Sequence, residues 1–253
     1  MGNSEYLLSS VANTLKILDV LGENEELSIG EICTKTGFGK SSVFRMLYTL
    51  ESSNFIRKTA SGKYTLGFKF AAYGYFVASN LNIRQVCKPF MIALRDACGE
   101  TVQLSILNDS GKVMFISKEL GNHNILPNIS IWEEKEAYSM SCGKTLLANI
   151  QRSTMLKYVE GYNLVQLTPN TITDKAVLLE QLERIRINGY AEDLEESEPN
   201  LVCFSAPIFN FERSCVAALS VSGPANRMYP KRDSLIEAVK ATARDISTAL
   251  GYN

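Results

Sequence analysis

The side chains best suited to chemistry stand in one short run, from Lys40 to Arg45, that contains no acidic residue. Its hydroxyl groups and cations can donate hydrogen bonds to phosphate oxygens and to base edges. The run therefore indicates a surface that binds nucleic acid. The residues expected to face the bases are Ser41, Ser42, Phe44 and Arg45.

Two short helices joined by a tight turn would position this run. Ser28 and Glu31 have the spacing of a capping box at the start of the first helix. Residues 36–39 then break the helix, and their two glycines suit a turn with positive φ. In the second helix, the apolar side chains fall on the face opposite the polar run: Val43, Met46, Leu47 and Leu50. This is the pattern of a helix-turn-helix, although many all-α domains also contain two amphipathic helices and a glycine turn.

A basic hairpin after these helices makes the nucleic-acid interpretation more specific. Residues 55–58 and 63–66 predict two strands around a turn that contains Gly62. A helix over 9–21, capped by Ser9 or Ser10, precedes the helix pair. Its expected apolar face consists of Val11, Leu15, Leu18 and Leu21, with Ile17 beside them. Three helices followed by a basic hairpin form the winged variant of the motif. The expected phosphate contacts are Lys40, Arg57, Lys58 and Lys63.

The charge of the chain is concentrated rather than uniform. The 253 residues carry a net charge of only −1. Between Lys35 and Lys69, however, seven Lys and Arg residues stand against a single acidic residue, Glu51. A nearly neutral chain with one basic patch fits a compact nucleic-acid footprint.

Several other classes of protein are disfavoured. No apolar run approaches the length of a membrane span, and the start of the chain lacks a signal peptide, so a cytoplasmic location is expected. None of the six cysteines forms a C-x-x-C pair, and the single histidine, His123, lies in a polar segment. The segments at Gly143-Lys144-Thr145 and Gly39-Lys40-Ser41 lack the earlier glycine of a phosphate-binding loop. We therefore expect no metal site, no catalytic residue and no cofactor.

The rest of the chain predicts an α+β domain with antiparallel hairpins. Helices are expected over 83–99, 141–150, 175–188 and 233–250, and strands over 101–107, 112–117, 201–209 and 214–222. The alternation within 101–107 predicts a half-buried strand. The apolar face expected for the helix over 83–99 consists of Val86, Phe90, Ala93, Leu94 and Ala97. A further strand is possible near 125–131. A helix over 67–80 would link the two halves. Its aromatic face would pack against a second copy of the chain or against the chain's own domains.

These segments together resemble the IclR family of bacterial transcription regulators. In the first half the resemblance rests on residues 28–32, 36–37, 40–45 and 62–64. In the second half it rests on residues 99–102, 141–148, 189–196 and 206–208, and most distinctively on Ser220-Val221-Ser222-Gly223-Pro224. The resemblance implies a winged helix-turn-helix over 1–67, a linker helix over 68–82 and a GAF-like effector-binding domain over 83–253. It also implies a homodimer or a homotetramer formed as a dimer of dimers.

The resemblance further implies an effector pocket at eight positions, namely Ser141, Cys142, Gly143, Asp193, Leu201, Cys203, Ser220 and Ser222. Ser220 and Ser222 are two apart on a predicted strand, so they share a face. A helix starting near Gly143 offers N–H groups to a carboxylate, which favours a small organic acid. The alternative is that the serines lie on a solvated face and Cys203 fills the core. Asn200 replaces a usual glycine of the family, and residues 132–138 and 210–214 also depart from its pattern.

The sequence thus predicts a ligand-responsive transcription regulator, such as a repressor, that binds a near-palindromic operator in double-stranded DNA. Arg45→Ala should lower operator preference, whereas Lys63→Ala should weaken binding to all DNA. The alternative is a small-molecule sensor or an enzyme that does not act on DNA, with the N-terminal helices as a dimerisation module.

Overall fold

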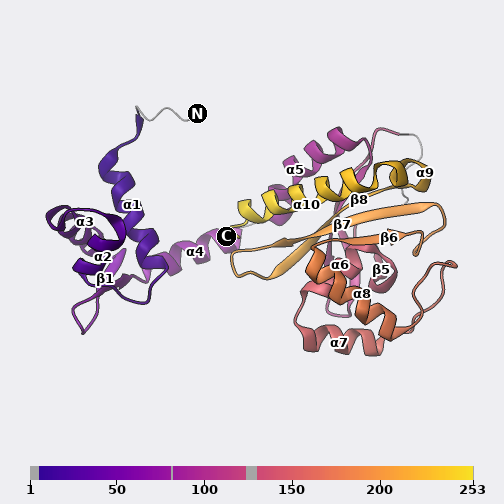
Figure 1. Ribbon diagram of the computed structural model, residues 1–253, viewed down its shortest axis with the longest axis horizontal. Coiled ribbons are helices and arrows are strands. Elements are labelled where there is room, and N and C mark those ends of the chain that lie inside the picture. Colours follow the sequence, from indigo (N-terminus) through magenta and orange to yellow (C-terminus); the bar gives the residue numbers. More distant parts are fainter. Residues whose placement is uncertain (1–5, 81, 124–129, 253) are drawn as a thin grey trace. The chain divides into compact units, whose positions relative to one another are not determined.

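A computed structural model describes residues 6–80, 82–123 and 130–252 of the chain. The chain divides into two compact units, residues 1–81 and residues 82–253 (Figure 1).

The first unit is a winged helix-turn-helix, as predicted. Its elements are α1 (Ser9–Gly22), α2 (Ile29–Thr36), α3 (Lys40–Ser52), β1 (Ile56–Lys58), β2 (Tyr64–Leu66) and α4 (Lys69–Asn80). Strands β1 and β2 pair antiparallel, and Leu27 adds an antiparallel bridge to Tyr64 of β2. The core lies between the helices and the hairpin and includes Ile17, Ile32 and Leu47.

The turn between α2 and α3 follows from local chemistry. Ser28 Oγ accepts from the Glu31 N–H at 3.3 Å, and the Glu31 carboxylate accepts from the Ser28 N–H at 2.7 Å, so the capping box is confirmed. Gly37 ends α2 with φ of 76°, a conformation that favours glycine. Gly39 has φ of −66°, so the prediction of positive φ was wrong for this second glycine.

Helix α1 differs from the prediction at its start and on its exposed side. Leu8 occupies the N-cap position, and no side chain caps the helix, so neither Ser9 nor Ser10 has the predicted capping role. Val11 and Leu15 are more than half exposed and line an open groove between α1 and α3. Of the predicted apolar positions, Ile17 and Leu21 are buried in the core.

The second unit is a six-stranded antiparallel sheet between two layers of helices (Figure 1). Its strands are β3 (Thr101–Leu107), β4 (Lys112–Glu119), β5 (Glu134–Glu136), β6 (Ala191–Leu194), β7 (Leu201–Phe209) and β8 (Cys215–Pro224), in the order β5-β4-β3-β8-β7-β6. The long helices α5 (Ile83–Cys98) and α10 (Arg232–Ala249) cover one face. The other face carries α6 (Ser141–Asn149), α7 (Arg152–Gly161) and α8 (Lys175–Asn188). A short helix, α9 (Ala225–Met228), follows β8. This arrangement confirms the predicted α+β class.

Because helices cover both faces, strand β3 is buried on both sides. Val102 and Leu104 pack toward α5 and α10, whereas Thr101, Gln103 and Ser105 face the opposite way. All five residues are buried, so the prediction of a half-buried strand was wrong. In α5, Cys87, Met91 and Leu94 form the buried face, whereas the predicted Ala93 and Ala97 are exposed.

Helices α7 and α9 and strands β5 and β6 were not predicted. Helix α7 buries only Met155 and Val159, which gives a weak helical period. Strands β5 and β6 are short, and acidic residues occupy half or more of their positions. Most of the strand expected near 125–131 lies outside the described residues.

Candidate functional site

Helix α3 presents the polar run at the surface of the first unit. The side chains of Lys40, Ser41, Ser42, Phe44 and Arg45 are all exposed. None of them makes a hydrogen bond or ion pair with the described part of the chain. The opposite face of α3 is fixed in the core by three buried residues, Val43, Leu47 and Leu50. The helix therefore offers unpaired donors on one face while the other face holds it rigidly.

The wing supplies three cations in two different environments. Arg57 and Lys58 are exposed, and each lies over an aromatic ring, Phe68 at 5.7 Å and Tyr64 at 5.8 Å. Lys63 instead lies 3.8 Å from the carboxylate of Glu26, which also accepts from the Ser61 hydroxyl. Glu26 precedes the basic segment between Lys35 and Lys69, so the charge balance of that segment does not include its carboxylate. It partly neutralises the Lys63 side of the wing.

The eight predicted effector residues come together where α6 covers the sheet. All eight are buried, including the two serines, so the alternative of a solvated serine face is wrong. Strand pairing places Asp193 opposite Cys203, and Cys203 opposite Ser222, across three neighbouring strands. Two residues further along β7 and β8, Ser205 lies opposite Ser220. Ser220 in turn lies opposite Gln103 of β3. These polar side chains form a buried row on the face of the sheet that α6 covers.

Gln103 and Asp193 organise the two ends of this row. The Gln103 Oε1 atom accepts from the hydroxyls of Ser222 at 3.0 Å and Ser220 at 3.4 Å. The Asp193 carboxylate accepts from the Glu196 N–H at 2.7 Å and from both the N–H and the hydroxyl of Ser197. Asp193 therefore holds the loop that follows β6, and its oxygens already have partners in the described structure.

An ion pair and a hydroxyl pair join α6 to the rest of the cluster. The Lys144 ammonium, which is fully buried, donates to Glu196 Oε1 at 2.6 Å. The hydroxyls of Thr145 and Ser205 lie 2.7 Å apart. Gly143 is required by close packing, because a Cβ there would meet the Ala137 carbonyl oxygen at 2.2 Å. The start of α6 is thus held by several fixed contacts.

Burial controls the ionisation of this cluster. It raises the pKa of the Cys142 thiol to about 12 and that of Cys203 well above its usual range, so both thiols stay protonated near neutral pH. Burial also raises the pKa of Asp193 and of Glu196, against the opposing effects of hydrogen bonds and of the Lys144 charge. Two protonated thiols provide no thiolate nucleophile. The cluster suits binding through hydrogen bonds.

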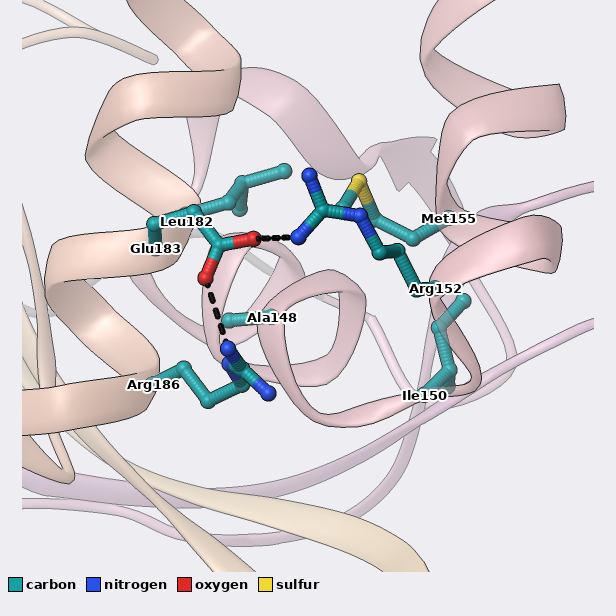
Figure 2. A pocket seen from close by; sticks show the side chains of 7 residues that line it. All are labelled: Ala148, Ile150, Arg152, Met155, Leu182, Glu183 and Arg186. Atoms are coloured by element: carbon teal, nitrogen blue, oxygen red, sulfur yellow. Dashed lines mark hydrogen bonds and ion pairs between the residues drawn. The ribbon is translucent and has the colours of Figure 1, made fainter.

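A separate small hollow of about 50 Å³ lies between α6, α7 and α8. Figure 2 shows the Glu183 carboxylate between the guanidinium groups of Arg152 and Arg186, at 2.6 and 2.9 Å. Both arginines are largely exposed, so these ion pairs contribute little stability. The hollow contains none of the predicted site residues.

The sequence interpretation missed several members of the buried cluster, including Gln103, Lys144, Thr145, Glu196 and Ser205. Gln103 has the position of a solvent-facing residue in a strand that was expected to be half-buried. Its alternation with Val102 and Leu104, together with the paired serines of β8, is a signal for a second polar strand. The register that places Gln103 opposite Ser220 cannot be obtained from the sequence alone.

Known protein families match both units of the chain. The family described as "Bacterial transcriptional regulator IclR C-terminal" matches residues 75–248, and the IclR helix-turn-helix domain matches residues 10–60. The chain belongs to the IclR family. Members of this family are transcription regulators, so the predicted family and helix-turn-helix are confirmed.

Relatives of this IclR-family chain match over nearly their whole length. The HTH-type transcriptional regulator KipR of Bacillus subtilis is 32% identical over 244 residues, which cover 96% of this chain and 97% of KipR. The HTH-type transcriptional repressor AllR of Salmonella typhi is 32% identical, covering 88% of this chain and 83% of AllR. The crystal structure of the Thermotoga maritima IclR is 31% identical, with a TM-score of 0.64, covering 96% of this chain and 99% of that chain. Among the described residues, no helix is long and apolar enough to cross a membrane.

Proposed function

We propose that this IclR-family chain is a ligand-responsive regulator that binds operator DNA through α3 and the wing. The exposed, unpaired donors of α3 carry this proposal. Ser41, Ser42, Phe44 and Arg45 would face the bases of the major groove. Lys40, Arg57 and Lys58 would bind phosphates, with a smaller contribution from Lys63 because Glu26 lies beside it.

The effector would bind in the buried polar cluster of the second unit. The predicted residues supply hydroxyl donors, thiols and the N-terminus of α6, enclosed by the sheet and three helices. A small carboxylic acid fits this chemistry because helix N-termini favour anions. Binding would alter DNA affinity only if the acid has different affinities for two arrangements of the chain.

We further propose that the regulator acts as a homodimer or homotetramer on a near-palindromic operator. Residues 1–67 would form the DNA-binding domain, residues 68–82 the linker helix and residues 83–253 the effector-binding domain. Two copies of α3 would enter major grooves about 10 bp apart or a multiple of that spacing. Relatives such as AllR carry the name of repressor, and we extend that direction of regulation to this chain.

Nuclease footprinting on the DNA upstream of the chain's own gene tests the proposal. The full chain should protect two inverted half-sites with the spacing given above. One acid from a panel of pyruvate, lactate, succinate and gluconate should change the concentration needed for protection. Uniform or absent protection across that DNA and other intergenic fragments would contradict operator binding. Protection that no acid alters would contradict the effector class while leaving the DNA-binding function intact.

A further inference from the structure

Three buried polar atoms in the cluster have no hydrogen-bond partner among the described residues: Gln103 Nε2, Ser141 Oγ and Glu196 Oε2. Gln103 and Ser141 are each only 1% exposed. A buried polar group without a partner loses its hydrogen bonds to water and gains none in return, so such groups are rare and call for an explanation.

Gln103 is left with a donor rather than an acceptor. A carboxamide oxygen can only accept, and Gln103 Oε1 already accepts from Ser220 and Ser222. The Nε2 group retains two N–H donors. The group that would satisfy it must therefore be an acceptor.

Ser141 lies in the same region, at the start of α6. Helix α6 packs against β3, the strand that carries Gln103. The N-cap residue Met140 provides no side-chain acceptor for the first N–H groups of α6. Unpaired polar groups thus stand on β3 and at the start of α6, the helix that packs against this strand.

The neighbouring carboxylates do not accept hydrogen bonds from these donors. Asp193 uses its oxygens for the loop at Glu196 and Ser197. Glu196 Oε1 accepts from Lys144. Glu196 Oε2 has no partner among the described residues, so it accepts from neither Gln103 nor Ser141. An acceptor with two oxygens and a negative charge suits several convergent donors and a helix N-terminus.

We propose that Gln103 is an effector-binding residue, whose Nε2 group binds a carboxylate of the effector together with the Ser141 hydroxyl. This inference rests on the proposed function and extends it, because Gln103 is not among the positions assigned through the family resemblance. Through its Nε2 group, Gln103 favours a negatively charged ligand. Through its oxygen, it connects the ligand to the serine pair of β8.

Thermal shift and calorimetric titration of the full chain with pyruvate, lactate, succinate and gluconate test this proposal. Gln103→Met should weaken binding of the acid that stabilises the wild type by about tenfold to a hundredfold, as expected for a lost hydrogen bond to a charged group. Gln103→Glu retains acceptors for both serines. It should shift preference by at least about tenfold from the acid toward its primary amide, because a carboxylate repels an anion and accepts from an amide.

Gln181→Met is the matched control, since Gln181 also has an unpaired amide atom but lies on α8. It should bind the acid as the wild type does. Equal acid binding by wild type and Gln103→Met, or an unchanged acid-to-amide preference in Gln103→Glu, would overturn the role of Gln103. Failure of every acid to bind the wild type would overturn the carboxylate assignment. Footprinting of the same preparation separates these outcomes from failure of the proposed function, which would abolish specific protection of DNA.

Discussion

Gly143 shows how a single residue fixes the start of α6. Its α-carbon packs against the backbone of Ala137, and any Cβ would meet the Ala137 carbonyl oxygen at 2.2 Å. The family resemblance assigned Gly143 to the effector pocket, where the start of a helix also offers N–H groups. The structure adds a steric requirement, since α6 could not approach residue 137 so closely with a larger side chain.

We therefore expect Gly143→Ala to lower the free energy of unfolding of the second unit by about 1–3 kcal/mol, the usual cost of overpacking. Gly161 in α7 is the matched control, because a Cβ there meets no atom within 4 Å. Gly161→Ala should change stability by less than about 1 kcal/mol. Urea unfolding followed by fluorescence of Trp132, the only tryptophan, measures both variants. Equal stability of the two would contradict the packing argument.

Asp193 predicts a specific dependence of stability on pH. Burial raises its pKa above the ordinary value of 3.8. As pH rises from 3.8 through the folded-state pKa, the unfolded chain loses the proton before the folded chain does. Stability contributed by this residue is therefore greatest at the acidic end and falls with rising pH.

The comparison of wild type with Asp193→Asn isolates this effect. The unfolding free energy of the wild type, minus that of the variant, should decrease between about pH 4 and about pH 7. Trp132 fluorescence in urea again provides the measurement. A difference that stays constant or increases over this range would show that the pKa of Asp193 is not raised.

At the scale of elements, the wing combines exposed and neutralised cations. Lys58 is exposed and has no carboxylate partner in the described chain, whereas Lys63 lies 3.8 Å from Glu26. Each phosphate contact contributes about 0.9 to the slope of log affinity against log salt. Lys58→Ala should reduce that slope by about 0.9, and Lys63→Ala should reduce it by less. Glu26→Gln should raise affinity for any duplex, because it frees Lys63.

Fluorescence anisotropy on one duplex at several salt concentrations measures these slopes. Lys58 and Lys63 belong to one hairpin, and Glu26 contacts it, so each variant serves as a control for the fold of the others. A larger loss of slope from Lys63→Ala than from Lys58→Ala would contradict the role of Glu26.

Local signals account for the elements that the sequence predicted well. The Ser28–Glu31 capping box, the αL residue at Gly37 and the Asp174 cap of α8 all act within a few residues. The unpredicted strand β6 depends on distant structure. Its Asp193 is buried because the following loop supplies hydrogen-bond donors, and an isolated acidic segment does not reveal this.

The contrast between local signals and distant contacts also explains which residues of the candidate site the sequence could predict. The Ser220–Ser222 spacing was visible because alternation along one strand is local. Gln103 was not identified, because its importance depends on the pairing of β3 with β8 and on the cover provided by α6. The pairing of Lys144 with Glu196 joins residues 52 positions apart.

At the scale of the whole molecule, association of copies would place two recognition helices on one operator. Phe68, beside the linker helix, is 82% exposed and leaves a large aromatic surface uncovered in a single chain. Phe68→Glu should weaken dimer formation, measured by analytical ultracentrifugation over a range of concentrations. Ile187→Glu is the control, since Ile187 is 81% exposed but lies on α8. Equal effects of the two substitutions would place the interface elsewhere.

The central claim is that α3 reads operator sequence, and a competition titration tests it most directly. The full chain would be titrated at two salt concentrations on its footprinted operator and on a scrambled duplex of equal length. Wild type should prefer the operator by about a thousandfold or more, and Arg45→Ala should reduce that ratio by about 1–3 kcal/mol while changing scrambled-duplex affinity far less. Equal wild-type affinity for both duplexes, or an Arg45→Ala loss of the same size on both, would contradict sequence reading by α3.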